Sequence, residues 1–140
     1  MTRKERLNKL FKENDLLAED VFKHKHFTII TRGGVDKIQA KNKIVVQYDV
    51  VRCEPNFAVV QATAVVELED SIPIQTFGSA LKGDTYDKGN TNSWYVMEIA
   101  EKRAMSRAVL KLAGLYELGV MSEDESPEFK KSKNNQKVEL

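Results

Sequence analysis

The stretch SWYVMEIAEKRAMSRAVLKLAG, residues 93–114, is the strongest helix signal in the chain, and the fold depends on it. Residues that favour helices, chiefly Ala, Met, Glu, Lys and Leu, fill its interior. Asn92 or Ser93 is placed to cap its start, and Gly114 is placed to end it in the left-handed conformation that glycine adopts after a helix. We therefore predict one long helix over residues 93–113.

Two rows of side chains distinguish the sides of this predicted helix. Ala100, Ala104 and Ala108 recur every four residues, and such a ridge of small side chains lets another element approach closely. A cationic row runs beside the ridge and comprises Lys102, Arg103, Arg107 and Lys111. The row is either a binding edge or a solvated face that Glu98 and Glu101 partly neutralise, and this stretch alone leaves both interpretations open.

Strand-like runs precede the helix. IVVQYDVVR at residues 44–52 and FAVVQATAVVELE at residues 57–69 are rich in β-branched and aromatic side chains, and turn-forming EPN separates them. We predict a long antiparallel hairpin over residues 43–69. A third strand is expected over residues 72–77, at an edge of the sheet, because Pro73 cannot donate a ladder hydrogen bond.

The two faces of the second predicted strand differ. Ala62 and Ala64 lie at the centre of one face, and we expect them to pack beneath the alanine ridge of the helix. Val59 and Val65 help to make the other face too apolar to be left fully in water. We expect an N-terminal helical arm or a second subunit to cover that face, so that the protein forms a homo-oligomer.

The fold class that follows is α+β. An antiparallel sheet of three or more strands packs against one long basic helix, with a helical arm at the N-terminus. We divide the chain into this arm at residues 1–22, a single core domain at residues 23–121, and a charged, mostly disordered tail at residues 122–140.

The composition is that of a soluble globular domain, with 41% hydrophobic and 31% charged residues. No apolar run approaches the roughly 18 residues needed to span a bilayer, and the start lacks the apolar segment of a secretory signal. We therefore expect a cytoplasmic protein without membrane association. The single Cys53 excludes an intramolecular disulfide, and His24 with His26 offers at most half of a metal site, so we expect no bound metal.

Charge is unevenly distributed along the chain, although the net charge is only +1. Residues 23–52 carry seven basic and two acidic side chains, a local charge of +5, whereas residues 116–140 carry four basic and six acidic ones, a local charge of −2. Such a basic segment can hold an anionic polymer. Within it, Arg32 and two glycines precede a predicted short helix at residues 35–41 that includes Lys37. The start of this helix could seat a phosphate on backbone amides, or could be a simple turn.

A long mobile loop is predicted over residues 78–92, GSALKGDTYDKGNTN, which have no hydrophobic period. Positive charges alternate with aromatic rings in and after this loop, at Lys82, Tyr86, Lys88 and Trp94. This composition is typical of proteins that neutralise a phosphate backbone while unpaired bases stack on the rings. In the alternative interpretation, Trp94 and Tyr95 anchor the start of the helix to the core.

Two motifs, TFGSAL and WYVMEIAEKRAMSRAVLKLAGLYELGVMSEDE, resemble a known family. Small phage and prophage proteins carry a TFG-x-A segment followed by an AEKRA-x-x-RA helix, and the single-strand annealing protein, or recombination mediator, superfamily is more distantly similar. The resemblance covers about residues 26–125. It implies that Lys102, Arg103 and Arg107 match the basic positions of the family helix, and that Thr76-Phe77-Gly78 matches the strand end before the loop.

The resemblance also implies a function. Such proteins bind single-stranded DNA in a groove along an oligomer, during phage or prophage recombination and repair in the cytoplasm of a bacterial host. This chain departs from the large annealing proteins because it is short and lacks a long basic C-terminal region. A simpler single-strand binder or accessory factor is therefore the alternative to a protein that forms rings or filaments.

Our hypothesis from the sequence is a single-stranded-DNA-binding protein, with replication or recombination proteins as further partners. The residues expected to contact DNA are Arg32, Lys37, Lys82, Tyr86, Lys88, Trp94, Lys102, Arg103 and Arg107. No G-x-S-x-G or HExxH motif and no convincing catalytic grouping is present, so we expect no enzyme and no cofactor. Two alternatives remain: an interaction module or host-factor inhibitor that binds no nucleic acid, and a divergent metal-dependent nuclease that uses Glu98 and Glu101.

Overall fold

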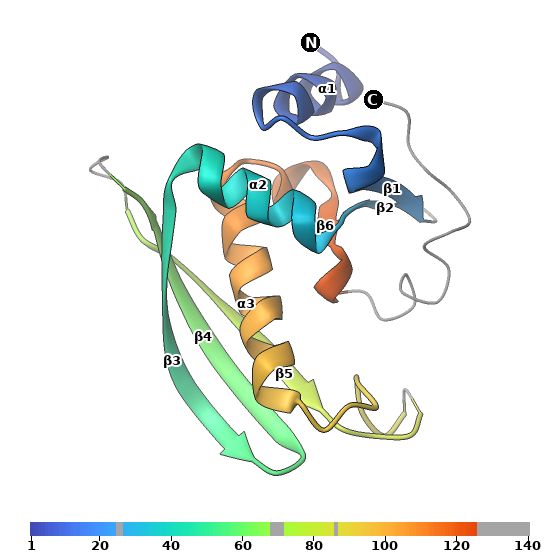
Figure 1. The fold of residues 1–140 in the computed structure, drawn as a ribbon, viewed down its shortest axis with the longest axis vertical. Coiled ribbons are helices and arrows are strands. Elements are labelled where there is room, and N and C mark those ends of the chain that lie inside the picture. Colours follow the sequence, from blue (N-terminus) through green and yellow to red (C-terminus); the bar gives the residue numbers. More distant parts are fainter. Residues whose placement is uncertain (25–26, 68–71, 86, 126–140) are drawn as a thin grey trace.

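A computed structural model of the chain describes residues 1–24, 27–67, 72–85 and 87–125 (Figure 1). Its helices are α1 (Arg3–Glu13), α2 (Arg32–Asn42) and α3 (Val96–Leu112). Its strands are β1 (Val21–His24), β2 (Phe27–Ile30), β3 (Ile44–Glu54), β4 (Phe57–Val66), β5 (Ile74–Leu81) and β6 (Val120–Ser122). Short 3-10 helices lie at Ala18–Asp20, Tyr116–Leu118 and Glu123–Glu125. The predicted α+β class is confirmed, and so is the packing of one long helix on an antiparallel sheet.

The main sheet has the strand order β3-β4-β5 and is antiparallel throughout. β3 and β4 form the predicted hairpin, which begins with the pair Ile44 and Val66. β5 differs from its prediction, because it starts at Ile74 and continues to Leu81 instead of ending at residue 77. The predicted loop therefore loses its first residues to the sheet.

β5 continues through Gly78, where α3 lies directly against the sheet. A Cβ atom at Gly78 would collide with the carbonyl oxygen of Ala100 and lie 2.5 Å from the amide nitrogen of Ala104. Next to it, the Thr76 hydroxyl donates a hydrogen bond of 2.6 Å to the Ala104 carbonyl. The small residues that the sequence assigned to this packing are fully buried in one core, namely Ala62, Ala64, Ala100, Ala104 and Ala108.

The start of α3 differs from the prediction, whereas its end agrees. The helix begins at Val96, and neither Asn92 nor Ser93 caps it, because Tyr95 is the N-cap residue and makes no side-chain capping bond. The Ser93 hydroxyl instead accepts a hydrogen bond of 3.1 Å from the Tyr95 amide, just before the helix. Gly114 has a φ of +78°, the left-handed conformation predicted for it.

The N-terminal arm is folded onto the core. α1 buries Leu7 and Phe11 in the main hydrophobic cluster, and Figure 1 shows α1 beyond α2, away from β3–β5. Next to it lies a second, small sheet, in which β2 pairs antiparallel with β1 and parallel with β6. The sequence did not predict this sheet, since strands of three or four residues are too short to show a period.

The acidic residues just after the boundary predicted at residue 122 are folded onto the core. Ser122 pairs with Ile30 in the small sheet, and the single turn Glu123–Glu125 packs on α3. Asp124 is only 7% exposed. Residues 126–140 of the predicted tail lie outside the described residues, and so does His26 of the His24-x-His26 pair.

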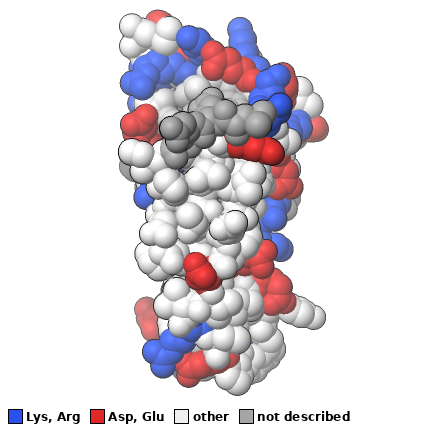
Figure 2. Space-filling view, turned by 90° about the vertical axis from the view of Figure 1, so that its left-hand side faces the viewer, with Lys and Arg blue, Asp and Glu red and all other residues white. Residues whose placement is uncertain are grey.

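The face of the main sheet that is turned away from α3 is poor in charge. Figure 2 shows a broad uncharged surface over β3–β5. Val45, Phe77 and Leu81 are exposed there, and neither α1 nor any other described element covers them. Cys53 is also exposed, near the end of β3. Among the described residues, no helix has the length and apolar character required to cross a membrane.

Candidate nucleic-acid interface

A cavity of about 710 Å³ lies between the loop that follows β5 and the first turns of α3. The loop supplies backbone, small polar side chains and Asp84, and α3 supplies Glu98, Lys102 and Arg103. Asp124 of the C-terminal turn also lines the cavity. Tyr95 stands at the junction between loop and helix and also lines the cavity. A glycine-rich wall next to cationic side chains and an aromatic ring is chemically suited to a phosphate with an attached base.

The described part of this loop is held by hydrogen bonds, in contrast to the predicted mobile loop. The Gly83 amide donates to the Thr91 carbonyl at 2.8 Å, and the Leu81 amide donates to Asn90 Oδ1 at 2.7 Å. A Cβ atom at Gly83 would lie 2.6 Å from the Gly89 amide nitrogen, so the two arms of the loop touch where glycine is required. The loop is thus a shaped wall of the cavity. Tyr86 lies outside the described residues.

Two aromatic side chains project into solvent where the loop meets α3. Trp94 is 65% exposed and Tyr95 is 70% exposed, so neither anchors the helix start to the core. The ammonium of Lys82 lies 4.4 Å from the centre of the Trp94 ring, a cation–π distance. The interpretation of these rings as anchors is therefore wrong, and both side chains are exposed to a partner, although Lys82 covers part of the Trp94 ring.

Of the basic residues predicted to contact DNA, Lys88 and Lys102 are the most accessible to a ligand. Both are exposed, and neither makes an ion pair with any described residue. Lys102 lines the large cavity, whereas Lys88 lies on the loop outside the cavity lining. Lys82 is less exposed, at 18% of its side chain, and its ammonium is 4.0 Å from a carboxylate oxygen of Asp84.

Arg103, one of the predicted DNA contacts, has a guanidinium that binds the backbone of three segments. Its Nε donates to the Asp124 carbonyl at 2.9 Å, its Nη1 to the Ser79 carbonyl at 2.8 Å, and its Nη2 to the Asn90 carbonyl at 3.0 Å. The side chain therefore fixes the loop, β5 and the C-terminal turn to α3. Its charge still contributes a positive potential to the cavity wall.

Arg107 is paired with an acidic residue of the C-terminal turn. Its Nε donates to Glu125 Oε1 at 2.6 Å, and the two side chains are 38% and 3% exposed. Burial raises the pKa of Glu125, while the charge and hydrogen bond of Arg107 oppose that rise. Both residues line a second cavity of about 320 Å³.

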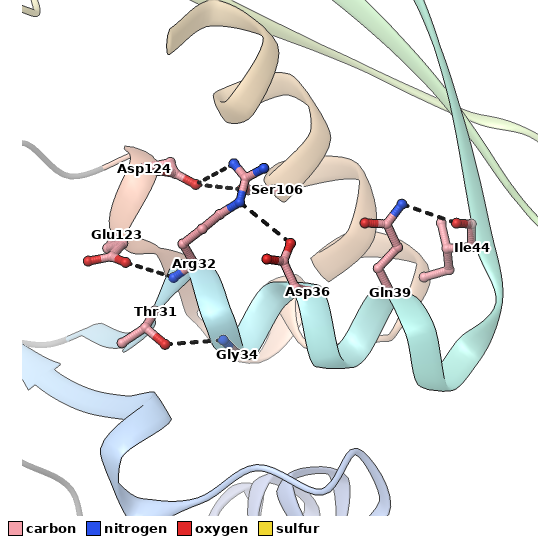
Figure 3. Close-up of polar contacts among 9 residues, drawn as sticks. All are labelled: Thr31, Arg32, Gly34, Asp36, Gln39, Ile44, Ser106, Glu123 and Asp124. Carbon is pink, nitrogen blue, oxygen red and sulfur yellow. Dashed lines mark hydrogen bonds and ion pairs between the residues drawn. The ribbon is translucent and has the colours of Figure 1, made fainter. Parts of the chain in front are cut away.

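Arg32 and Lys37 do not join this site, because other carboxylates hold them. The Arg32 amide donates to Glu123 Oε1 at 2.7 Å, and its guanidinium lies 3.5 Å from both Asp36 and Asp124 (Figure 3). The predicted phosphate seat at the start of α2 is thus filled by a carboxylate of the chain itself. Lys37 contacts buried Asp20 at 2.6 Å, and neither basic residue lines a cavity.

Sequence reasoning missed several residues of this region, including Asn90, Ser79 and Phe77 at the second cavity and the acidic run Glu123–Glu125. The acidic run was visible as three consecutive carboxylates, but its position in the fold was not. Within the described residues, no group of three or more His, Cys, Asp or Glu side chains is placed to hold a metal ion.

Comparison with known proteins adds no family assignment. No protein-family model matches the chain, and neither the curated proteins nor the solved structures contain a significant match. The resemblance to single-strand annealing proteins therefore rests on the two sequence motifs alone.

Proposed function

We propose that the protein is a non-enzymatic binder of single-stranded DNA that acts through the loop after β5 and the first turns of α3. The observation that carries the proposal is the exposed ring of Tyr95 beside Lys102 in the lining of the 710 Å³ cavity. The exposed ring of Trp94, which precedes Tyr95 in the chain, lies against Lys82. Exposed aromatic rings are unfavourable in water, and stacking on bases would cover them.

The chemistry of this surface favours a single strand over a duplex. Stacking on a side-chain ring requires the face of a base, which a duplex hides between base pairs. The lysines Lys82, Lys88 and Lys102 are point charges that suit phosphates without selecting a sequence. We therefore expect binding that depends strongly on salt and weakly on base sequence.

The biological setting of this proposal comes from the sequence motifs. Their similarity to phage and prophage recombination proteins supports a role in DNA recombination or repair in a bacterial cytoplasm, with strand annealing as one form of that role. Replication or recombination proteins are the further partners that this setting suggests.

The test is fluorescence anisotropy of labelled oligo-dT and of its duplex, over a salt series, with and without magnesium. Trp94 is the only tryptophan, so its intrinsic fluorescence reports directly whether a base stacks on it. Lys102→Ala should weaken binding and flatten the plot of log K against log salt by about 0.7, the slope of one phosphate contact to a single strand. Lys9→Ala, which removes an exposed lysine of α1 at the other end of the molecule, is the matched control.

Three outcomes separate the candidate functions. Binding that prefers the single strand and quenches Trp94 supports the proposal. Absence of binding at about 100 mM salt refutes it. Magnesium-dependent cleavage of the oligonucleotide would instead favour the nuclease, and Glu98 and Glu101 would then be the residues to substitute.

A second candidate, a protein-binding role, is favoured by the uncharged outer face of the main sheet. Val45, Phe77 and Leu81 are exposed on it, and only a few charged side chains interrupt the face (Figure 2). We propose that this face mediates a homo-oligomer alongside DNA binding. Light scattering tests this by measuring the molar mass of the unmodified protein and of Val45→Lys in solution. The variant should have the lower molar mass, and equal masses would refute the assignment.

A further inference from the structure

The second cavity adjoins the proposed DNA site along the free edge of β5. Its volume is about 320 Å³, and Phe77, Ser79, Asn90, Arg107 and Glu125 help to line it. Asn90 and Arg103 line both cavities, so the two share a wall. A single strand of DNA that occupies the first cavity can therefore continue into the second.

Glu125 is an unfavourable occupant of this second cavity. One carboxylate oxygen accepts the 2.6 Å hydrogen bond from Arg107, but the other, Oε2, is buried and has no hydrogen-bond partner among the described residues. The side chain is only 3% exposed. A buried charged oxygen without a partner costs free energy, and the raised pKa of Glu125 shows that burial outweighs the attraction of Arg107.

The wall of the cavity that α3 forms offers a phosphate site. Arg107 presents a guanidinium, which can bind a phosphate through two parallel N–H groups. Phe77 also lines the cavity, but its side chain lies on the sheet face turned away from α3. An arginine and an anion thus meet in this cavity, and the anion is supplied by the chain itself.

We infer that this cavity is a second nucleotide subsite, in which the Glu125 carboxylate occupies the phosphate position until a bound strand replaces it. The inference rests on the proposed single-stranded-DNA function and specifies how the strand continues along β5. The ligand is a phosphodiester whose phosphate binds Arg107.

The exchange requires only a local movement. Glu123 and Asp124 stay attached through the Arg32 amide at 2.7 Å and the Ser106 hydroxyl at 3.0 Å, so β6 need not be released. Glu125 is the last residue of its turn, and rotation of its side chain would place both carboxylate oxygens in water. The hydration that Oε2 gains offsets the loss of the contact with Arg107, which the phosphate then takes over.

The test compares Glu125→Gln with Glu117→Gln, an exposed carboxylate that gives the same change in net charge. The probe is labelled oligo-dT of about 20 nucleotides, long enough to cover both cavities. We expect Glu125→Gln to lower the Kd roughly fivefold, the size of a partly exposed charge interaction. The salt plot should steepen by about 0.7, because one more phosphate contact forms. With Arg107→Ala already present, Glu125→Gln should have no effect on the Kd.

If the unmodified protein binds oligo-dT but Glu125→Gln binds it with the same Kd and salt slope as Glu117→Gln, the subsite is refuted and the proposed function stands. If no variant binds oligo-dT, both are refuted.

Discussion

Replacing Arg103 by alanine should destabilise the fold, because its guanidinium donates hydrogen bonds of 2.8–3.0 Å to carbonyls of Ser79, Asn90 and Asp124. A hydrogen bond from a charged donor contributes about 1.5–3 kcal/mol when it is well shielded, and less near solvent. The Arg103 side chain is half-buried, so we take about 1 kcal/mol for each bond. The free energy of unfolding should fall by about 3 kcal/mol, which corresponds to a decrease in Tm of roughly 10 °C.

The assay is urea unfolding followed by circular dichroism, with Lys102→Ala as the matched control one residue earlier on α3. Lys102 is exposed and unpaired among the described residues, so its loss should change stability by less than about 0.5 kcal/mol. Arg103→Lys keeps the charge but cannot reach three carbonyls at once, so it should lose most of the same stability. If Arg103→Ala is as stable as Lys102→Ala but loses DNA binding, Arg103 is a DNA ligand and the structural role given to it here is wrong.

The structure also predicts the direction of two further changes in stability. Gly78→Ala should cost at least about 3 kcal/mol in urea unfolding, because its Cβ would meet α3 backbone, whereas Gly33→Ala should stabilise by about 0.5–1 kcal/mol, because the nearest atom, on Thr31, is 4.0 Å from the added Cβ. An equal effect of the two would refute the close packing. For Glu125, burial raises the pKa, Asp124 adds to the rise, and Arg107 and Arg103 oppose it. The folded state then holds a proton that the unfolded chain has lost, so the stability of the unmodified protein relative to Glu125→Gln should decrease as pH rises from about 4.5, the ordinary value. If the stability of the unmodified protein relative to Glu125→Gln instead increases with pH, the raised pKa is refuted.

Local signals in the sequence were sufficient for the main elements. The alanine spacing and Gly114 defined α3 to within a few residues, and alternation with an EPN turn defined the β3–β4 hairpin. These features depend on residues close in sequence, so helix and strand periods reveal them. The exposed positions of Trp94 and Lys102 also agree with the predicted binding surface, although the sequence equally allowed Trp94 to be a core anchor.

The tertiary structure alone decided which cations are available to a ligand. The basic residues of the cationic row on α3 follow one helical spacing, but their environments differ. Arg103 binds carbonyls 13–24 residues away, and Arg107 pairs with Glu125. Lys102 remains in solvent. Likewise, Gly78 was assigned to a loop because the helix that requires it lies further along the chain. Helical spacing places side chains on one edge, but their partners come from β5, the loop and the C-terminal turn, and only the folded chain brings these segments together.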